Sequence, residues 1–190
     1  MTDEKDIYFI EKQSISIGDF ECADSWILDI GGGGEGIIGQ IKGSKVVAID
    51  IRESELEEAS GDSLKILMDA RDMKFLNKTF DTITAFFSLM YVKPDELELI
   101  FKEANRVLKP DGIFLIWDAI FFVPKDSTKK FIGLYLDILL PNEKLVETGY
   151  ATKIHNQNGE EIGKIAKENG FNLIENKKMG KTFFLKLKKS

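Results

Sequence analysis

The stretch Trp26-Ile27-Leu28-Asp29-Ile30-Gly31-Gly32-Gly33-Gly34-Glu35-Gly36 joins a short apolar run directly to a run of glycines. Short apolar runs bounded by glycine are typical of buried strands, and residues 36–42 have the pattern of a short helix. A glycine-rich turn between a strand and a helix lets backbone N–H groups and the positive helix end approach a bound ligand. The stretch therefore predicts a strand, a loop and a helix, with a ligand site at the loop.

The same alternation of apolar runs and amphipathic stretches continues toward Asp118. Strands are expected at 26–30, 45–50, 64–69, 80–87 and 113–118. A helix is expected from Ser54, because Ser54 and Glu57 have the spacing of a capping box. The most regular helix is expected from Pro94, since proline suits a first helical position. Strands that alternate with helices form parallel sheets, so the pattern predicts a doubly wound, mostly parallel α/β fold.

The pattern changes beyond Asp118. Residues 131–140 and 145–154 predict a β-hairpin, and we interpret 121–157 as an inserted hairpin or lid that follows the fifth strand. Asn158 is expected to cap a last helix. Residues 171–175 and 182–187 predict two final strands, which are close enough in sequence to pair antiparallel.

The composition indicates one domain over residues 1–190, because 43% of the residues are apolar. The formal net charge of −6 argues against nucleic acid as a partner. Cys22 is the only cysteine, which indicates a reducing compartment. The sequence starts without a signal-peptide pattern and has no apolar run long enough to span a bilayer. We therefore expect a cytoplasmic protein with no membrane association.

Two aspartates narrow the choice of ligand. The spacing Gly31-x-Gly33-x-x-Gly36 also satisfies the dinucleotide fingerprint, so the glycines alone do not exclude a nicotinamide cofactor. Asp29 lies before the first glycine, where a carboxylate would crowd a pyrophosphate and would suit a cationic amino or sulfonium group. Asp50 ends the next strand, where a carboxylate can accept both ribose hydroxyls in either kind of site. The pair favours a ribose-containing ligand that carries positive charge.

The segment Ile27–Gly33 resembles the first motif of the class I S-adenosylmethionine-dependent methyltransferases. Later segments are similar to further motifs of that family in the same order, namely Val47–Asp50, Met68–Ala70, Phe80–Leu89 and Arg106–Gly112. The resemblance implies a Rossmann-like fold with a seven-stranded sheet and an antiparallel C-terminal hairpin. It also implies S-adenosyl-L-methionine as the cofactor and S-adenosyl-L-homocysteine as the product.

The resemblance also implies roles for individual residues. Asp50 would bind the ribose, and the Asp69 carboxylate with the Ala70 amide would meet the adenine. The full set of implied cofactor-binding residues is Asp29, Gly31, Gly33, Asp50, Ile51, Asp69, Ala70 and Phe86. Glu35 departs from the pattern, which usually has a third glycine there. We expect its carboxylate to face solvent in the first turn of the helix, where the helix dipole favours an acid.

Fewer residues indicate where the molecule that accepts the methyl group would bind. Tyr91, Trp117 and Asp118 follow the fourth and fifth strands, at the edge where ligands bind in open α/β sheets. Tyr150 belongs to the inserted hairpin, from which it can close over an acceptor. These four residues are the candidate lining of an acceptor pocket. His155 is the only histidine, and we interpret it as a solvated loop residue.

Methyl transfer from a sulfonium is an in-line displacement that depends on positioning and on excluding water. We therefore assign no catalytic side chain and expect no metal site. The Asn/Asp-Pro-Pro-Tyr run of enzymes that methylate cytosine, adenine or glutamine is absent after the fourth strand, where Phe86-Phe87-Ser88-Leu89 stands. We expect an enzyme that methylates a small molecule. A nicotinamide-dependent oxidoreductase and a non-catalytic S-adenosylmethionine-binding module are the alternatives.

Overall fold

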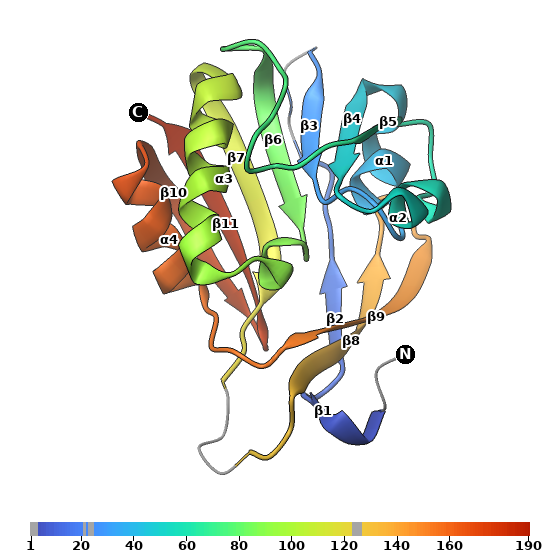
Figure 1. Ribbon diagram of the computed structural model, residues 1–190. Coiled ribbons are helices and arrows are strands. Elements are labelled where there is room, and N and C mark those ends of the chain that lie inside the picture. Colours follow the sequence, from blue (N-terminus) through green and yellow to red (C-terminus); the bar gives the residue numbers. More distant parts are fainter. Residues whose placement is uncertain (1–3, 21, 23–24, 123–126) are drawn as a thin grey trace.

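The computed structural model describes residues 4–20, 22, 25–122 and 127–190. Its centre is a seven-stranded sheet with the order β10-β11-β7-β6-β3-β4-β5 (Figure 1). The strands are β3 (Ile27–Ile30), β4 (Val46–Asp50), β5 (Leu64–Leu67), β6 (Phe80–Phe86), β7 (Leu108–Ala119), β10 (Phe171–Met179) and β11 (Thr182–Lys189). Strands β3 to β7 run parallel, and β11 pairs antiparallel with β7 and β10. The predicted mostly parallel sheet with an antiparallel C-terminal pair is confirmed.

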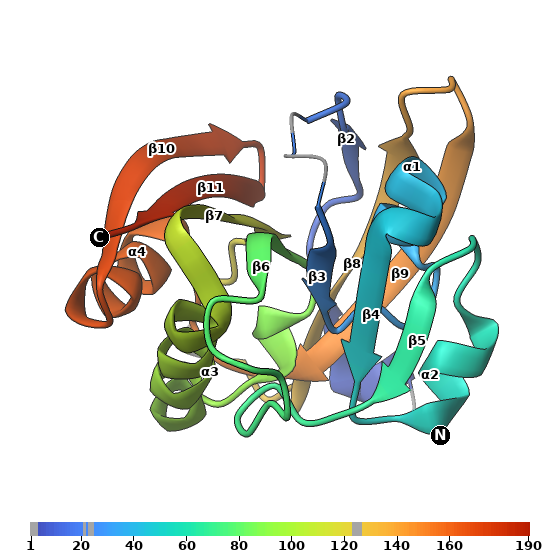
Figure 2. The ribbon, with the colours of Figure 1, turned by 90° about the horizontal axis from the view of Figure 1, so that it is seen from above.

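One face of this sheet is covered by α3 (Pro94–Val107) and α4 (Gly159–Glu168), as Figures 1 and 2 show. Helix α3 begins at Pro94, and its buried positions are Leu97, Ile100, Phe101, Ala104 and Val107. Helix α4 is capped by Asn158, whose side chain accepts hydrogen bonds from the backbone N–H groups of Glu160 and Glu161, both at 3.0 Å. Both predicted helix starts are confirmed.

The opposite face is covered by α1 (Ile37–Lys42) and by a second, four-stranded sheet (Figure 2). Its strands are β1 (Ile7–Phe9), β2 (Gln13–Ser16), β8 (Phe131–Leu139) and β9 (Leu145–Lys153). Strand β8 pairs antiparallel with β9, as predicted, and parallel with β1 and β2, which the sequence pattern does not predict. The β8 side chains that face the core are fully buried: Ile132, Leu134, Leu136 and Ile138. Strand β8 therefore forms a buried layer against the central sheet.

Side chains of the central strands alternate between these two layers. Leu28 of β3 and Val47 of β4 pack with the cluster under α3 and α4. Ile27 and Ala48 pack with the cluster under α1 and β8. Because successive residues of a strand point to opposite faces, Asp29 is directed toward the face that the small sheet covers. The sheet thus places a carboxylate in an otherwise apolar layer.

The start of α2 (Glu53–Glu58) differs from the prediction. No side chain caps this helix, so the expected capping box of Ser54 and Glu57 is not formed. The Asp50 carboxylate instead accepts a hydrogen bond from the backbone N–H of Arg52 at 2.9 Å. This bond fixes the turn after β4, so Asp50 has a structural role at the place where the sequence predicts a ligand contact.

Candidate active site

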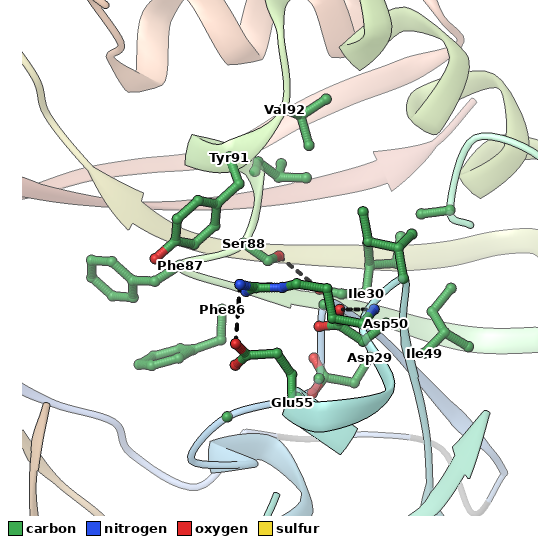
Figure 3. Close-up of a pocket in the computed structure, with 18 of the residues that line it drawn as sticks. Asp29, Ile30, Ile49, Asp50, Glu55, Phe86, Phe87, Ser88, Tyr91 and Val92 are labelled. Carbon is green, nitrogen blue, oxygen red and sulfur yellow. Dashed lines mark hydrogen bonds and ion pairs between the residues drawn. The ribbon is translucent and has the colours of Figure 1, made fainter. Parts of the chain in front are cut away.

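A cavity of about 630 Å³ opens at the carboxyl ends of β3, β4 and β6. This volume lies in the usual range for small-molecule sites, about 300–1,000 Å³. Its wall includes the whole glycine run, and it is the edge at which open α/β sheets bind their ligands. Figure 3 shows the acidic side chains Asp29, Asp50 and Glu55 on one side of it and the rings of Phe86, Phe87 and Tyr91 on the other.

The glycine loop is held tightly between β4 and the end of β6. The backbone N–H groups of Gly31 and Gly32 donate to the Ile49 carbonyl at 2.8 and 3.1 Å. Gly31 has a φ of 70°, and a Cβ atom there would come within 2.4 Å of the Ser88 Cβ. The Ser88 hydroxyl donates to the Ile30 carbonyl at 2.6 Å, which keeps it at this place. Glycine at position 31 is therefore required by conformation and by space alike.

Asp29 is the most deeply buried acid of the cavity wall, with 2% of its surface exposed. Its carboxylate accepts a hydrogen bond from the Thr84 hydroxyl at 2.7 Å. Burial is the main cause that raises the pKa of Asp29 to about 7; the hydrogen bond from Thr84 opposes this rise, and the nearby charge of Asp50 contributes to it. A cation that enters the cavity would stabilise the charged form of Asp29.

Asp69 and Ala70 also line the cavity, and Asp69 is fixed by an arginine. Arg71 donates to both Asp69 carboxylate oxygens at 2.7–3.0 Å and reaches Glu96 of α3 at 2.6 Å. The hydrogen bonds from Arg71 lower the pKa of Asp69, so this carboxylate is charged at neutral pH. Ile51 lies at the rim, with 64% of its surface exposed.

Aromatic side chains form the wall opposite the acids. Phe86, Phe87 and Tyr91 follow the end of β6, where Leu89–Tyr91 forms a short 3-10 helix. Tyr150 comes from β9, and its ring stacks on Phe87 with centroids 5.5 Å apart and planes 15° apart. Strand β9 therefore supplies part of the cavity wall, including Tyr150.

Glu35 does not face solvent, so that expectation is wrong. Its carboxylate lines the cavity and accepts hydrogen bonds from the Thr148 hydroxyl and, at 2.9 Å, from the Tyr150 hydroxyl. Helix α1 begins only at Ile37, so Glu35 lies in the loop and not in a helical turn. The glycine loop is thereby joined to β9, a contact between segments more than a hundred residues apart.

Trp117 and Asp118 are not part of the cavity wall. Trp117 is buried among aromatic rings, with the Phe184 ring at 4.9 Å. The Asp118 carboxylate is buried and accepts hydrogen bonds from the Met90 backbone N–H and the Gln157 side chain, both at 3.0 Å. Asp118 therefore fixes the 3-10 helix that contains Tyr91, and it does not itself line the cavity.

Several wall residues are missing from the sequence-based set. Arg52 and Glu55 line the cavity but stand outside the motif segments, and Phe87 and Ser88 lie in the motif segment Phe80–Leu89 without being assigned a role there. Arg52 pairs with Glu55 at 3.1 Å, and its guanidinium lies 5.9 Å from the Tyr91 ring centroid. His155, by contrast, lies outside the wall, and its ring bonds the Lys153 carbonyl at 2.7 Å.

Residues 28–116 match the model of a family described as a methyltransferase domain. The chain is 36% identical over 104 residues to the sterol 4-C-methyltransferase strm-1 of Caenorhabditis elegans, a match that covers 49% of this chain and 30% of that protein. The chain thus spans under a third of this relative.

Solved structures share the fold. The PH0226 protein of Pyrococcus horikoshii OT3 has a TM-score of 0.64 and 20% identity, over 87% of this chain and 83% of that chain. A SAM-dependent methyltransferase from Methanosarcina mazei has a TM-score of 0.63 and 19% identity, over 87% and 92% of the two chains. The segment that matches the methyltransferase-domain family contains the glycine run, Asp50 and Asp69 in the predicted order.

Proposed function

We propose that this cavity binds S-adenosyl-L-methionine and that the protein transfers its methyl group to a small-molecule acceptor. The observation that carries the proposal is the charge of the wall. Seven carboxylates line the cavity, Asp29, Glu35, Asp50, Glu55, Glu58, Asp69 and Glu96, against two arginines, Arg52 and Arg71. Such a wall attracts a ligand that bears a sulfonium and an ammonium group.

The residues of this chain fit that cofactor. Asp50 would accept the ribose hydroxyls, Asp69 and the Ala70 amide would meet the adenine, and Ile51 and Phe86 would border the rings. The glycine loop with Gly31 and Gly33 would hold the amino-acid part beside Asp29. When bound, the cofactor would supply a methyl carbon that an acceptor nucleophile attacks in line, while the carbon–sulfur bond breaks and its electron pair stays on the sulfur of S-adenosyl-L-homocysteine.

The same charge distribution argues against a nicotinamide-dependent oxidoreductase. A pyrophosphate at the glycine loop would face the Asp29 and Glu35 carboxylates, with repulsion on both sides. A thermal-shift panel separates the two functions, because ligands that bind the folded state raise its melting temperature. S-adenosyl-L-homocysteine is expected to stabilise the protein and NADH is not, and the reverse result would overturn the proposal.

A non-catalytic module remains the second alternative, since a cofactor site does not by itself prove turnover. A labelled-methyl assay on fractionated metabolites tests it. We expect label to move from S-adenosyl-L-methionine to a small-molecule fraction, and a protein variant with Asp50→Ala serves as the control. Tight cofactor binding without transfer to any fraction would support the module instead.

The acceptor is proposed to be a small molecule because the cavity volume of about 630 Å³ lies in the usual range for small-molecule sites. No helix in the described part of the chain is long and apolar enough to cross a lipid bilayer. We further propose that residues 1–190 act as one methyltransferase domain with 121–157 as its insertion. The burial of β8 against the central sheet supports this, because it gives the insertion no core of its own.

A further inference from the structure

One end of the cavity is bounded by Glu35, Phe87, Tyr91 and Tyr150. These residues come from four different segments: the glycine loop, the end of β6, the 3-10 helix and β9. The rings of Phe87 and Tyr150 are stacked, and the Tyr91 hydroxyl lies at the Ala151 backbone of β9. We call this group the aromatic end of the cavity. None of its members belongs to the set that the family motifs assign to the cofactor.

Glu35 differs from the three acids of the wall that form ion pairs. Glu55 is paired with Arg52, and Asp69 and Glu96 share Arg71. The Glu35 carboxylate has only neutral hydroxyl donors, those of Thr148 and Tyr150, and within the described residues it forms no ion pair. A carboxylate offers about four acceptor positions, so the Glu35 oxygens can accept further hydrogen bonds.

The two tyrosines at this end remain neutral. Burial raises the pKa of Tyr91 to about 12, and burial together with the Glu35 charge raises the pKa of Tyr150 well above its ordinary value. Neither phenol can therefore act as a base at neutral pH or contribute charge. The aromatic end holds one negative charge, that of Glu35, among apolar and phenolic groups.

Aromatic faces with an adjacent carboxylate are a general means of binding a cation. In this cavity the Arg52 guanidinium already lies 5.9 Å from the Tyr91 ring centroid, with its charge balanced by Glu55. We propose, on the basis of the function proposed above, that the aromatic end is the acceptor subsite. It takes a small molecule with a positively charged nitrogen, whose charge faces Glu35 and whose body packs against Phe87, Tyr91 and Tyr150.

Binding of a matched series of probes to protein saturated with S-adenosyl-L-homocysteine tests this subsite. Phenethylamine, phenethyl alcohol and phenylacetate have similar size and carry a positive, a zero and a negative charge. Calorimetry is expected to show the amine binding about tenfold more tightly than the alcohol, with phenylacetate weakest. Glu35→Gln keeps the shape of the side chain and is expected to remove the preference for the amine.

Glu147→Gln is the matched control. Glu147 also carries a negative charge and lies on β9, but its side chain is 71% exposed and pairs with Lys12 outside the cavity. This variant is expected to bind the three probes as the unaltered protein does. If Glu147→Gln reduced the preference as much as Glu35→Gln, general charge and not the subsite would explain it, and the inference would be wrong.

The affinity for S-adenosyl-L-homocysteine, measured on the same samples, separates the two proposals. If S-adenosyl-L-homocysteine binds normally but phenethylamine binds no more tightly than phenethyl alcohol, the proposed subsite is wrong and the proposed function stands. If Glu35→Gln weakens the homocysteine derivative rather than the amine, Glu35 belongs to the cofactor and the inference is overturned. If the unaltered protein does not bind the homocysteine derivative, the proposed function fails, and this inference fails with it.

Discussion

The Tyr150 hydroxyl donates a hydrogen bond to the Glu35 carboxylate at 2.9 Å, and this bond joins two segments that are 115 residues apart. Glu35 belongs to the glycine loop and Tyr150 to β9, so the bond ties the small sheet to the floor of the cavity. Because Thr148 also donates to Glu35, the junction has two hydrogen bonds to one carboxylate. The wall of the site is thus assembled from both layers of the molecule.

Removing that hydroxyl is expected to weaken the fold. Tyr150→Phe keeps the stack on Phe87 but leaves Glu35 with one donor fewer, and hydrogen bonds to charged groups contribute about 1.5–3 kcal/mol. We expect a loss of about 1–2 kcal/mol in the free energy of unfolding, measured in urea. Tyr135→Phe is the control, since Tyr135 lies on β8, is 44% exposed and uses its ring face against Phe9. Equal losses in the two variants would contradict the role of the bond.

The raised pKa of Asp29 predicts how the free energy of unfolding depends on pH. Its pKa is raised from 3.8 to about 7, so the folded state holds a proton that the unfolded state releases. The free energy of unfolding therefore falls as the pH rises from about 4 to about 7. Asp29→Asn removes this contribution, and the fall between about pH 4 and about pH 7 is expected to be smaller in the variant. Identical pH profiles would show that Asp29 is not protonated in the fold.

The same residue predicts that cofactor affinity depends on pH in the opposite direction. A ligand whose ammonium group lies beside Asp29 prefers the charged form of that residue, so affinity for S-adenosyl-L-homocysteine should rise up to about pH 7 and then level off, by at most about tenfold per pH unit. Asp29→Asn is expected to flatten the profile. Asp118→Asn is the control, because burial also raises the pKa of Asp118 to about 7 but its carboxylate lies behind the wall. If only Asp118→Asn lost the pH dependence of the affinity, Asp118 and not Asp29 would be its source, and the prediction would be contradicted.

Arg71 is expected to act on affinity more than on stability. Arg71→Ala frees the Asp69 carboxylate from its two-oxygen contact and removes the link to Glu96. The pair is partly exposed, so the free energy of unfolding should change by less than about 1 kcal/mol. Affinity for S-adenosyl-L-homocysteine should fall several-fold, since Asp69 would lose its orientation. Lys74→Ala removes an exposed pair with Asp72 and is expected to change neither quantity. Unchanged affinity in Arg71→Ala would exclude a positioning role.

The central sheet was predictable because its signals are local. The strand that ends at Ile30, the start of α3 at Pro94 and the cap at Asn158 each depend on a few neighbouring residues, and all three lie as expected. Strands β1 and β2 were not predictable in this way. Each is very short, and both pair with β8, which lies far along the chain. Pairings at such a distance leave no local pattern.

The candidate site also contains residues that local sequence signals predict and residues that depend on distant parts of the chain. Asp29, Asp50 and Asp69 gather in one cavity because each follows or ends a parallel strand, and such ends meet at one edge of a sheet. Trp117 is expected at the same edge of the sheet but packs into the core. Alternation along β7 directs its side chain to the layer under the small sheet. The partners of Glu35 are absent from the sequence pattern, because they depend on where β9 crosses the glycine loop.

A variant that tests cofactor binding in the cavity must leave the glycine loop undisturbed, and Gly31→Val does not. Gly31→Val would place a side chain against Ser88 at a φ of 70°, so it would disturb the loop itself as well as any bound ligand. Asp50→Ala removes a carboxylate without adding atoms. Asp62→Ala is its control, because Asp62 is exposed beyond the end of α2 and outside the cavity wall.

Calorimetric titration of S-adenosyl-L-homocysteine into the unaltered protein, Asp50→Ala and Asp62→Ala tests whether the cavity is the cofactor site. We expect saturable binding to the unaltered protein and to Asp62→Ala. In Asp50→Ala the affinity should be lower by about tenfold or more, as expected when hydrogen bonds between a ribose and a charged group are lost. Equal affinity in all three proteins, or no binding to any of them, would contradict the assignment of the cavity.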